Sequence, residues 1–197
     1  MTNDVWTWLI ETGEWPFSAH EILGIEKQES PSWCFDRFGQ SKTHLPDGSS
    51  LFIGGEHEDS YDEDFYIYND VVIKRQDGSI EVLGYPIEVL PPTDFHSATL
   101  VGDKIFIIGR LGYEYQRKSE RTDTYILDTK DFSIERLKSD GVTPPGLHKH
   151  VAKLSDDQHA ITCEQGLVLD PVSGHVVENT TSWCLSLASA RWEQLSD

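Results

Sequence analysis

The chain has 197 residues, of which 38% are hydrophobic and 11% are aromatic, a composition typical of one globular domain and not of a disordered segment. Its 34 acidic and 16 basic side chains give a net charge of −18. This charge disfavours nucleic acids and anionic membranes as partners, because basic side chains are what attract both.

The N-terminal residues Met1 to Trp6 lack the basic region and apolar core of a signal peptide. No apolar run approaches the ~20 residues needed to span a bilayer. Three cysteines, Cys34, Cys163 and Cys184, lie far apart in the sequence. Their odd number and wide spacing favour free thiols in a reducing compartment, and we expect a cytoplasmic protein without membrane contact.

The first segment, residues 1–16, is predicted to hold a lone outer strand at about 5–10. Trp6-x-x-Leu9 is followed by Gly13 and Pro16, and Ile134-x-x-Leu137 is followed by Gly141 and Pro144 at the same offsets. Ile80-x-x-Leu83 and Trp192-x-x-Leu195 have the same core spacing. All four alternate with period 2 and follow turn residues, which predicts strands. Residues 17–36 alternate poorly and are expected to form an irregular insert.

The remainder of the chain contains a repeat. His96-x-Ala98-x-Leu100 recurs 54 residues later as His150-x-Ala152-x-Leu154, and Gly55 and Gly109 are also 54 residues apart. We therefore divide the single domain into units 37–90, 91–145 and 146–197, the last of them degenerate because Cys163 and Glu164 stand where glycine is expected. A period of about 50 residues with four strands per unit indicates the blades of a β-propeller.

Two stretches resemble Kelch repeats, namely Leu51 to Gly55 with Tyr68 to Ile73, and Ser182 to Leu195. In that family a hydrophobic strand ends in Gly-Gly, here Gly54 and Gly55, and an aromatic residue marks the outermost strand. The resemblance implies an all-β fold of Kelch-like propeller blades: about three four-stranded antiparallel blades plus the N-terminal strand, a partial propeller. The repeat positions given a structural role are Gly54, Gly55, Gly109, His96, His150, Trp6 and Trp192.

The glycines are interpreted as positions where a Cβ would obstruct a close backbone approach or a positive φ. A phosphate-binding glycine loop would need a helix N-terminus after it. The sequence after Gly55 is acidic instead, so we favour the structural interpretation.

The segment Glu56 to Asp64 has six carboxylates in nine residues and lies between the second and third strands of its blade. It lacks the spacing and the glycine of a calcium loop, so it is either a solvated loop or a docking site for a basic partner. Its candidate binding residues are Glu56, His57, Asp59, Asp62 and Asp64.

The equivalent loop of the next blade is basic and aromatic, and its candidates are Arg110, Tyr113, Tyr115 and Arg117. Loops at one end of a propeller converge, so the two loops are expected to lie together. Tyrosine and arginine are favoured at the centres of binding interfaces. Simple charge pairing between the loops is an equally good interpretation.

His148 and His150 would lie on one side of a strand. A zinc site would need a third ligand, such as His159 or Cys163. His150 matches His96 across the repeat, however, and no histidine matches His148. A repeated structural contact is the simpler explanation, and we expect neither a metal nor a cofactor.

The sequence contains no recognisable catalytic motif. We therefore predict a non-enzymatic protein interaction module and, more narrowly, an acidic neutralising partner of a basic protein. The alternative, which comes from the family resemblance, is a small-molecule (sugar-like) binding protein or an enzyme of the Kelch-like propeller type.

Three blades are too few to close a ring, and an open arc would leave sheet faces exposed. Tryptophans gather near both termini, at Trp6, Trp8, Trp15 and Trp33 and at Trp183 and Trp192. We therefore expect a homodimer of two half-propellers. The competing arrangement is a fourth, degenerate blade built from the insert and the first strand.

Overall fold

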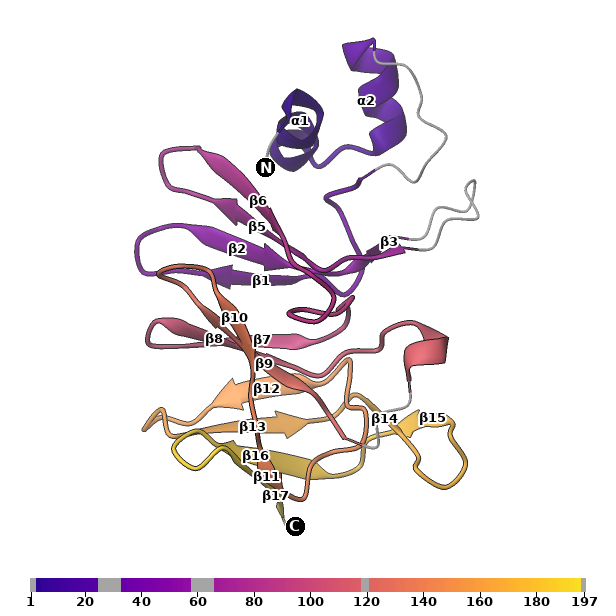
Figure 1. Cartoon of the computed structure of the whole chain (residues 1–197), viewed down its shortest axis with the longest axis vertical. Coiled ribbons are helices and arrows are strands. Elements are labelled where there is room, and N and C mark those ends of the chain that lie inside the picture. The colour runs from indigo at the N-terminus through magenta and orange to yellow at the C-terminus, as the bar shows by residue number, and fades with distance from the viewer. Residues whose placement is uncertain (1–2, 25–32, 58–65, 118–120, 196–197) are drawn as a thin grey trace.

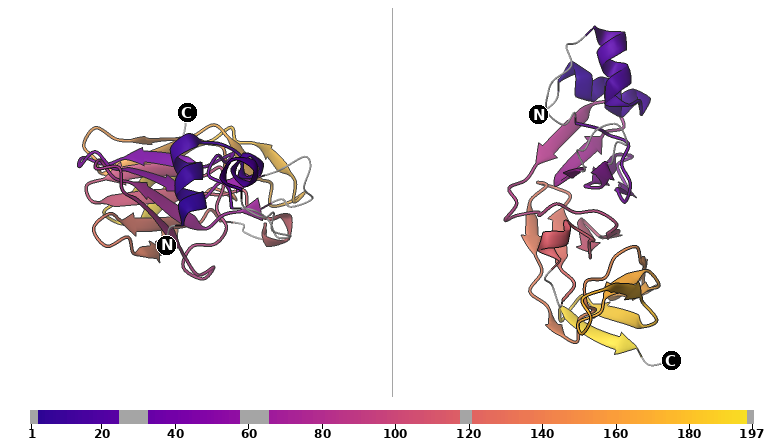
Figure 2. Two further views of the ribbon diagram at one scale, coloured as in Figure 1. Left: turned by 90° about the horizontal axis from the view of Figure 1, so that it is seen from above. Right: turned by 90° about the vertical axis from the view of Figure 1, so that its right-hand side faces the viewer.

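The computed structural model describes residues 3–24, 33–57, 66–117 and 121–195. Strands dominate, and three sheets follow one another along the long axis of the molecule (Figure 1). Seen from the side, the sheets stack face to face in an open arc (Figure 2). The expected all-β, propeller-like fold is thus confirmed.

Each sheet contains four antiparallel strands in chain order. The first holds β1 (Ser41–His44), β2 (Ser50–Ile53), β5 (Asp70–Lys74) and β6 (Ile80–Gly84). The second holds β7 (Ser97–Val101), β8 (Lys104–Ile108), β9 (Thr124–Asp128) and β10 (Ile134–Arg136). The third holds β12 (Val151–Leu154), β13 (Ala160–Glu164), β16 (Ser182–Ser186) and β17 (Arg191–Leu195), and β11 (Asp140–Gly141) adds a short parallel strand beside β17.

The connections between the second and third strands of the sheets are the long ones, and they project at the same end of the three sheets (Figure 1). We call the described part of this region the loop end: residues 54–57, 66–69, 109–117, 121–123 and 165–181. It carries the paired strands β3 (Glu56–His57) and β4 (Tyr66–Ile67), the 3₁₀ turn η1 (Glu114–Gln116), and the hairpin of β14 (Leu167–Leu169) and β15 (Val176–Glu178).

The strand expected over residues 5–10 is wrong. Residues Asp4–Thr12 form helix α1, and Pro16–Leu23 form helix α2. The Asn3 side chain accepts a hydrogen bond from the backbone N–H of Trp6 at 2.8 Å, and Gly13 ends the helix with φ +70°. These are standard start and stop signals of a helix. The Trp-x-x-Leu spacing suits a helix face as well as a strand, which is why the pattern misled.

The alternative in which the insert builds a fourth blade is also wrong for the described part of residues 17–36, which contains helix and no strand. The helices instead cover the free face of the first sheet. Trp6 and Ile10 pack there with Val72 and Val82, and Trp33 and Phe35 join the same cluster.

Two apolar cores separate the three sheets. Leu51, Ile53, Ile73, Ile105 and Leu127 belong to the core between the first and second sheets. The second core joins residues of β8 and β9 to the third sheet, where Trp183 and Trp192 are buried. The middle sheet is thus covered on both faces, which accounts for the uninterrupted apolar run of Ile105 to Ile108.

Glycine is required at two of these joints. Gly54 and Gly109 each follow the second strand of a sheet directly, with φ of +54° and +75°. A Cβ at Gly54 would lie 2.1 Å from the carbonyl oxygen of Thr93, and one at Gly109 would lie 2.1 Å from that of Leu147. Both carbonyls belong to the segment that leads into the next sheet, so the absent side chain lets neighbouring blades approach.

His96 and His150 make the same contact in successive blades. Nε2 of His96 lies 2.7 Å from Oγ of Ser41, and Nε2 of His150 lies 2.8 Å from Oγ of Ser97. Each histidine therefore joins the start of its own blade to the start of the preceding one. Burial lowers the pKa of His96 to about 3 and that of His150 to about 4, so both rings are neutral at pH 7.

Candidate functional site

The loop end holds a small cavity of about 40 Å³ between the second and third sheets. Three arginines line it, Arg110, Arg117 and Arg121, together with Thr122, His148 and Asp123, whose carboxylate is paired with Arg136. Three basic residues around one cavity stand out in a chain whose net charge is −18. Guanidinium groups match carboxylates and phosphates in shape and charge, so this arrangement suits an anionic group.

Two of these arginines, Arg110 and Arg117, hydrogen-bond to backbone carbonyls. Arg110 donates to the carbonyl oxygen of Pro92 at 3.3 Å, and Arg117 donates to that of Gly112 at 3.1 Å. Neither forms an ion pair with a carboxylate of the described residues. Four other arginines do so, namely Arg37, Arg75, Arg136 and Arg191.

A buried carboxylate holds the backbone next to Arg110 in place. Asp94 is completely buried, and its Oδ1 accepts a hydrogen bond from the backbone N–H of Gly112 at 2.7 Å. His148, on the opposite wall, has Nδ1 at 2.9 Å from the carbonyl oxygen of Gly146. Burial lowers the pKa of His148, and Lys149 and Arg117 lower it further. The imidazole is therefore neutral at pH 7. The positive charge of the cavity comes from its arginines, and its one lining carboxylate, Asp123, is paired with Arg136.

Two tyrosines extend the site outward from the cavity. The hydroxyl oxygen of Tyr113 accepts a hydrogen bond from the backbone N–H of Ile67 at 2.8 Å, which ties the second blade's loop to β4 of the first. The Tyr115 ring stacks on Tyr113 with centroids 5.6 Å apart and is 71% exposed. The structure thus places the four basic and aromatic candidates, Arg110, Tyr113, Tyr115 and Arg117, on one loop beside the first blade's loop.

The acidic candidates divide into two groups. Glu56 and His57 form β3, and His57 is buried. Asp59, Asp62 and Asp64 lie outside the described residues. The Ile67–Tyr113 hydrogen bond joins the loop that follows the acidic segment to the basic and aromatic loop.

Sequence reasoning missed a buried charge pair near the first sheet. Arg37 forms two hydrogen bonds to the carboxylate of Asp70, at 2.5 and 3.0 Å, and donates to the carbonyl oxygen of Cys34 at 2.7 Å. Its guanidinium lies 3.4 Å from the ring centroid of Tyr68. The partners are 33 residues apart in the chain and no motif joins them, so no sequence signal could have paired them.

A cysteine and a histidine meet beside this pair. Sγ of Cys34 lies 3.2 Å from Nδ1 of His57 and donates to the carbonyl oxygen of Asp36 at 2.9 Å. Such a pair resembles a nucleophile and its base. Burial, however, raises the pKa of Cys34 to about 12, and the residue is 1% exposed. The thiol is therefore protonated and inaccessible, which identifies the pair as a structural contact.

The zinc ligands considered from the sequence do not converge. Lys149 has φ +53°, so His148 and His150 do not follow the alternation of a strand, and β12 begins only at Val151. Among the described residues no group of three or more His, Cys, Asp or Glu side chains could hold a metal ion.

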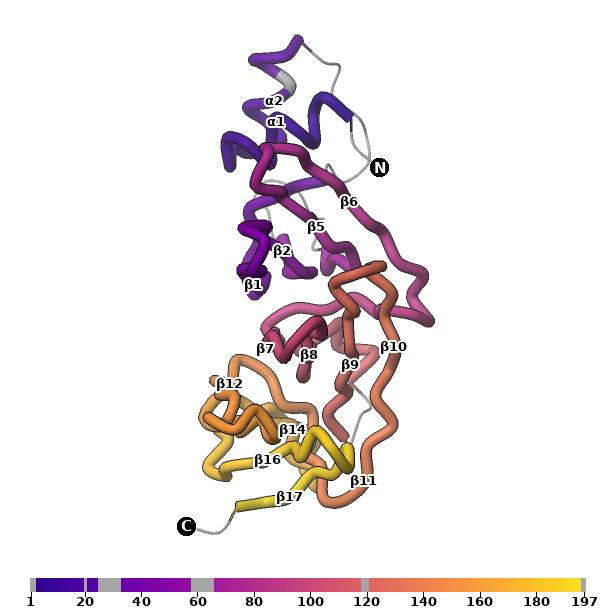
Figure 3. The backbone as a smooth tube through the Cα atoms, turned by 90° about the vertical axis from the view of Figure 1, so that its left-hand side faces the viewer, coloured from indigo at the N-terminus to yellow at the C-terminus, as the bar shows by residue number. Residues whose placement is uncertain are grey.

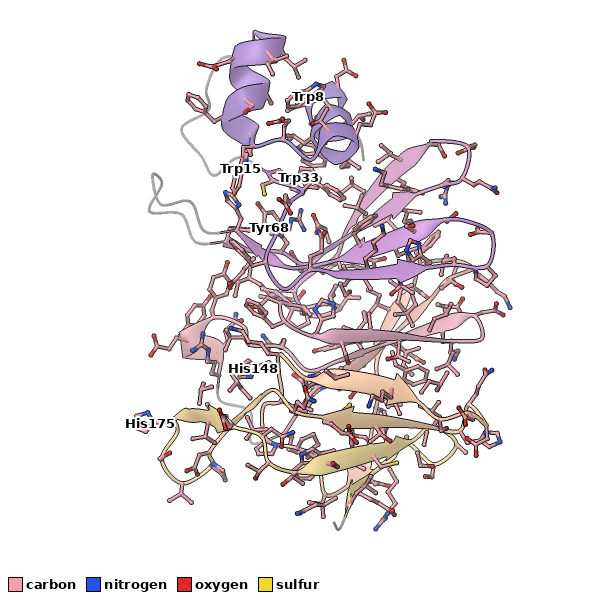
Figure 4. The ribbon with its side chains drawn as sticks, turned by 180° about the vertical axis from the view of Figure 1, so that it is seen from behind. Trp8, Trp15, Trp33, Tyr68, His148 and His175 are labelled. Atoms are coloured by element: carbon pink, nitrogen blue, oxygen red, sulfur yellow. The ribbon has the colours of Figure 1, made fainter. Side chains whose placement is uncertain are left out.

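A larger pocket, of about 320 Å³, lies between the helices and the first sheet. Trp6, Trp33, Tyr66 and Tyr68 line it with Asp70. Figure 4 shows Trp33 and Tyr68 between the helices and the first sheet, and His148 farther along the molecule. The molecule therefore has two separate candidate sites: the arginine-lined cavity at the loop end and an aromatic pocket near the helices.

The sequence matches no protein-family model and no curated protein. Among solved structures, that of YjhT is similar, with a TM-score of 0.61 and 13% sequence identity. The match covers 81% of this chain and 52% of YjhT, so the chain spans about half the length of that protein. At this identity the likeness shows the fold alone. Across the described residues no helix is long and apolar enough to cross a membrane.

Proposed function

We propose that this protein is a non-enzymatic interaction module built on Kelch-like blades, and that its loop end binds a protein partner. The observation that carries the proposal is the arginine-lined cavity beside the exposed ring of Tyr115. Arginine and tyrosine at the centre of a surface are typical of residues that dominate binding energy.

The chemistry of the cavity supports one anchoring contact. At about 40 Å³ it accommodates the end of a side chain and not a whole metabolite. A carboxylate of the partner fits its charge, because Arg110 and Arg117 donate only to backbone carbonyls within the described residues. A bidentate contact to either arginine would fix the orientation of the partner.

The remainder of the partner's surface is proposed to be basic. The net charge of −18 favours association with a basic protein through long-range attraction. In this form the protein is an acidic neutralising partner. The three cysteines are free thiols, which supports the further proposal that it acts in the cytoplasm.

Affinity capture from the native cells tests this proposal. The wild-type chain should retain a specific protein, and the double variant Arg110→Glu/Arg117→Glu should lose it. Lys104→Glu is a matched control, because Lys104 is exposed at the start of β8, at the opposite end of that strand from the loop end. Equal recovery by the double variant and the control, with both folded, would overturn the proposed binding surface.

A further inference from the structure

The aromatic pocket is separate from the loop-end cavity and has its own chemistry. α1 supplies Trp6, and the segment before the first sheet supplies Trp33. β4 supplies Tyr66, and Tyr68 and Asp70 lie next to it in the chain. The rings of Trp6 and Trp33 stack with centroids 4.9 Å apart, and those of Tyr66 and Tyr68 meet edge to face at 4.9 Å. Aromatic ring surfaces therefore form much of the pocket's lining.

The charges in the walls already balance one another. The carboxylate of Asp70 accepts two hydrogen bonds from Arg37 and one, at 2.8 Å, from Nε1 of Trp33. The guanidinium of Arg37 also lies near the rings of Tyr68 and Trp33, at 3.4 and 5.0 Å from their centroids. A cationic ligand is disfavoured, because the carboxylate is already bonded and the guanidinium of Arg37 behind the rings would repel it. An anionic ligand is disfavoured, because the carboxylate of Asp70 would repel it. The pocket therefore favours an uncharged ligand.

Hydrogen bonding narrows the ligand class further. A sugar ring could stack on these side chains, but each of its hydroxyls also donates a proton and needs an acceptor. The pocket's carboxylate is already engaged by three donors. Asn69 also lines the pocket, but its one amide oxygen does not serve the several hydroxyls of a sugar. The hydroxyl of Tyr66, whose side chain is exposed, and the indole N–H of Trp6 can instead donate. The pocket thus suits a ligand that has flat apolar rings and carbonyl acceptors but few donors.

A proline-rich segment has these properties. Proline lacks a backbone N–H, and a polyproline II helix leaves its carbonyls without internal partners. Its rings dock against grooves lined by aromatic side chains at a low cost in conformational entropy. The volume, near the lower end of the ~300–1,000 Å³ range of ligand sites, suits a short peptide segment. We propose that the pocket lined by Trp6, Trp33, Tyr66 and Tyr68 binds an uncharged proline-rich segment of a partner protein.

Titration calorimetry with a ten-residue polyproline peptide tests this proposal. The wild-type chain should bind it saturably, with a dissociation constant below about 1 mM, and should not bind a glycine-serine peptide of equal length. Tyr66→Ser should weaken binding about tenfold or more, since it removes an aromatic ring from the pocket. Val151→Ser, which alters an exposed apolar residue of the third sheet, should bind like the wild type.

Trp6→Phe is a second variant, which keeps a ring against Trp33 and removes the indole N–H. It should weaken binding several-fold without changing the melting temperature by more than a few degrees. Absence of saturable polyproline binding overturns the proposal, and so does equal binding by Tyr66→Ser and the wild type. Binding of a neutral monosaccharide in place of polyproline would identify the pocket as a sugar site. The arginine variants leave this pocket intact, so failure here is independent of the loop-end proposal.

Discussion

At the N-terminal end of the arc, the outer face of the first sheet is apolar and lies under α1. At the C-terminal end, no described element covers the outer face of the third sheet (Figure 3). On the first sheet, the residues that pack against α1 are Phe52, Val72 and Val82. On the third sheet, Thr162, Cys184 and Glu193 form one row across β13, β16 and β17, with ion pairs Lys153–Glu164 and Arg191–Glu193 nearby.

The residues that join blades also differ between a blade with a neighbouring sheet and a blade at the end of the arc. The position of His96 and His150 is occupied by Gln40 in the first blade, where no sheet precedes. The position of Ser41 and Ser97 is occupied by Val151 in the third blade, where no sheet follows.

The glycine position shows this most clearly. Gln165 follows β13 as Gly54 follows β2 and Gly109 follows β8, and it keeps a positive φ of +60°. No carbonyl from a following sheet constrains its side chain, so glycine is needed only where another blade approaches. Each of these residues therefore occurs where a neighbouring sheet makes contact with it.

The largest effect is expected from placing an aspartate on each outer face. Val72 is completely buried under α1, so Val72→Asp should leave a buried charge without a partner and cost at least ~3 kcal/mol of unfolding free energy. Thr162→Asp adds the same group to the exposed face, beside Lys153, and should change stability by less than ~1 kcal/mol. Urea unfolding of the two variants measures the difference. Similar losses would show that the two faces are alike.

A methyl group at a blade joint should have the next largest effect. Gly109→Ala places a Cβ against the carbonyl oxygen of Leu147 and strains a positive φ, for a cost of roughly 2–4 kcal/mol. Gly174 has nearly the same φ, +71°, but open space around it, so Gly174→Ala should cost only ~1 kcal/mol. Thermal and urea unfolding compare the two. Equal costs would mean that backbone conformation, and not blade contact, selects glycine at Gly109.

Acid should weaken the joints that contain histidine. The folded pKa values of His96 and His150, about 3 and about 4, lie below the ordinary 6.5. The unfolded chain therefore binds protons first, so stability is full above pH 6.5 and falls as the pH drops below it. From pH 7 to 5.5 the two residues together should cost about 2 kcal/mol.

The double variant His96→Gln/His150→Gln copies the side chain that Gln40 supplies in the first blade. It should lose most of this pH dependence while remaining folded. Urea midpoints at the two pH values provide the test, and an unchanged slope in the variant would show that other groups cause the acid effect.

The smallest effect is expected at the helical cover itself. Asn3→Ala removes the acceptor for the N–H of Trp6 and should cost about 1 kcal/mol. Asn3→Ser, which restores an oxygen at the cap, should recover most of that loss. If alanine has no effect on unfolding, α1 does not contribute to the stability of the first sheet.

The sequence predicted the sheets well because its repeat records contacts that recur. His96 and His150 make the same contact in successive blades, so their spacing of 54 residues revealed the blade period. Gly55 and Gly109 have the same spacing in the sequence, although the structural counterpart of Gly109 is Gly54. The helices were missed because the three-residue spacing of Trp6 and Leu9 fits a helix face as well as a strand. The other segments with this spacing are strands, so the comparison between them favoured a strand here too.

The candidate site was predicted in part. The sequence alone could group Arg110, Tyr113, Tyr115 and Arg117, because they lie within eight residues of one loop. The participation of His148 in the cavity, and the pairing of Arg37 with Asp70, depend on contacts between segments far apart in the chain. Nothing in local composition encodes such contacts.

The homodimer expected from the sequence stays a prediction. At the N-terminal end Phe17 and Ile22 of α2 are exposed, whereas the row of Thr162, Cys184 and Glu193 makes the outer face of the third sheet a poor apolar interface. We therefore expect the outer face of the third sheet to be a solvated surface. Light scattering across a wide concentration range tests this most directly. The predicted result is a mass, whether near 22.4 kDa or twice that value, that Thr162→Asp does not change. A mass that rises toward twice that value, and that Thr162→Asp returns to the monomer, would show that the outer face of the third sheet is an interface and would contradict the account.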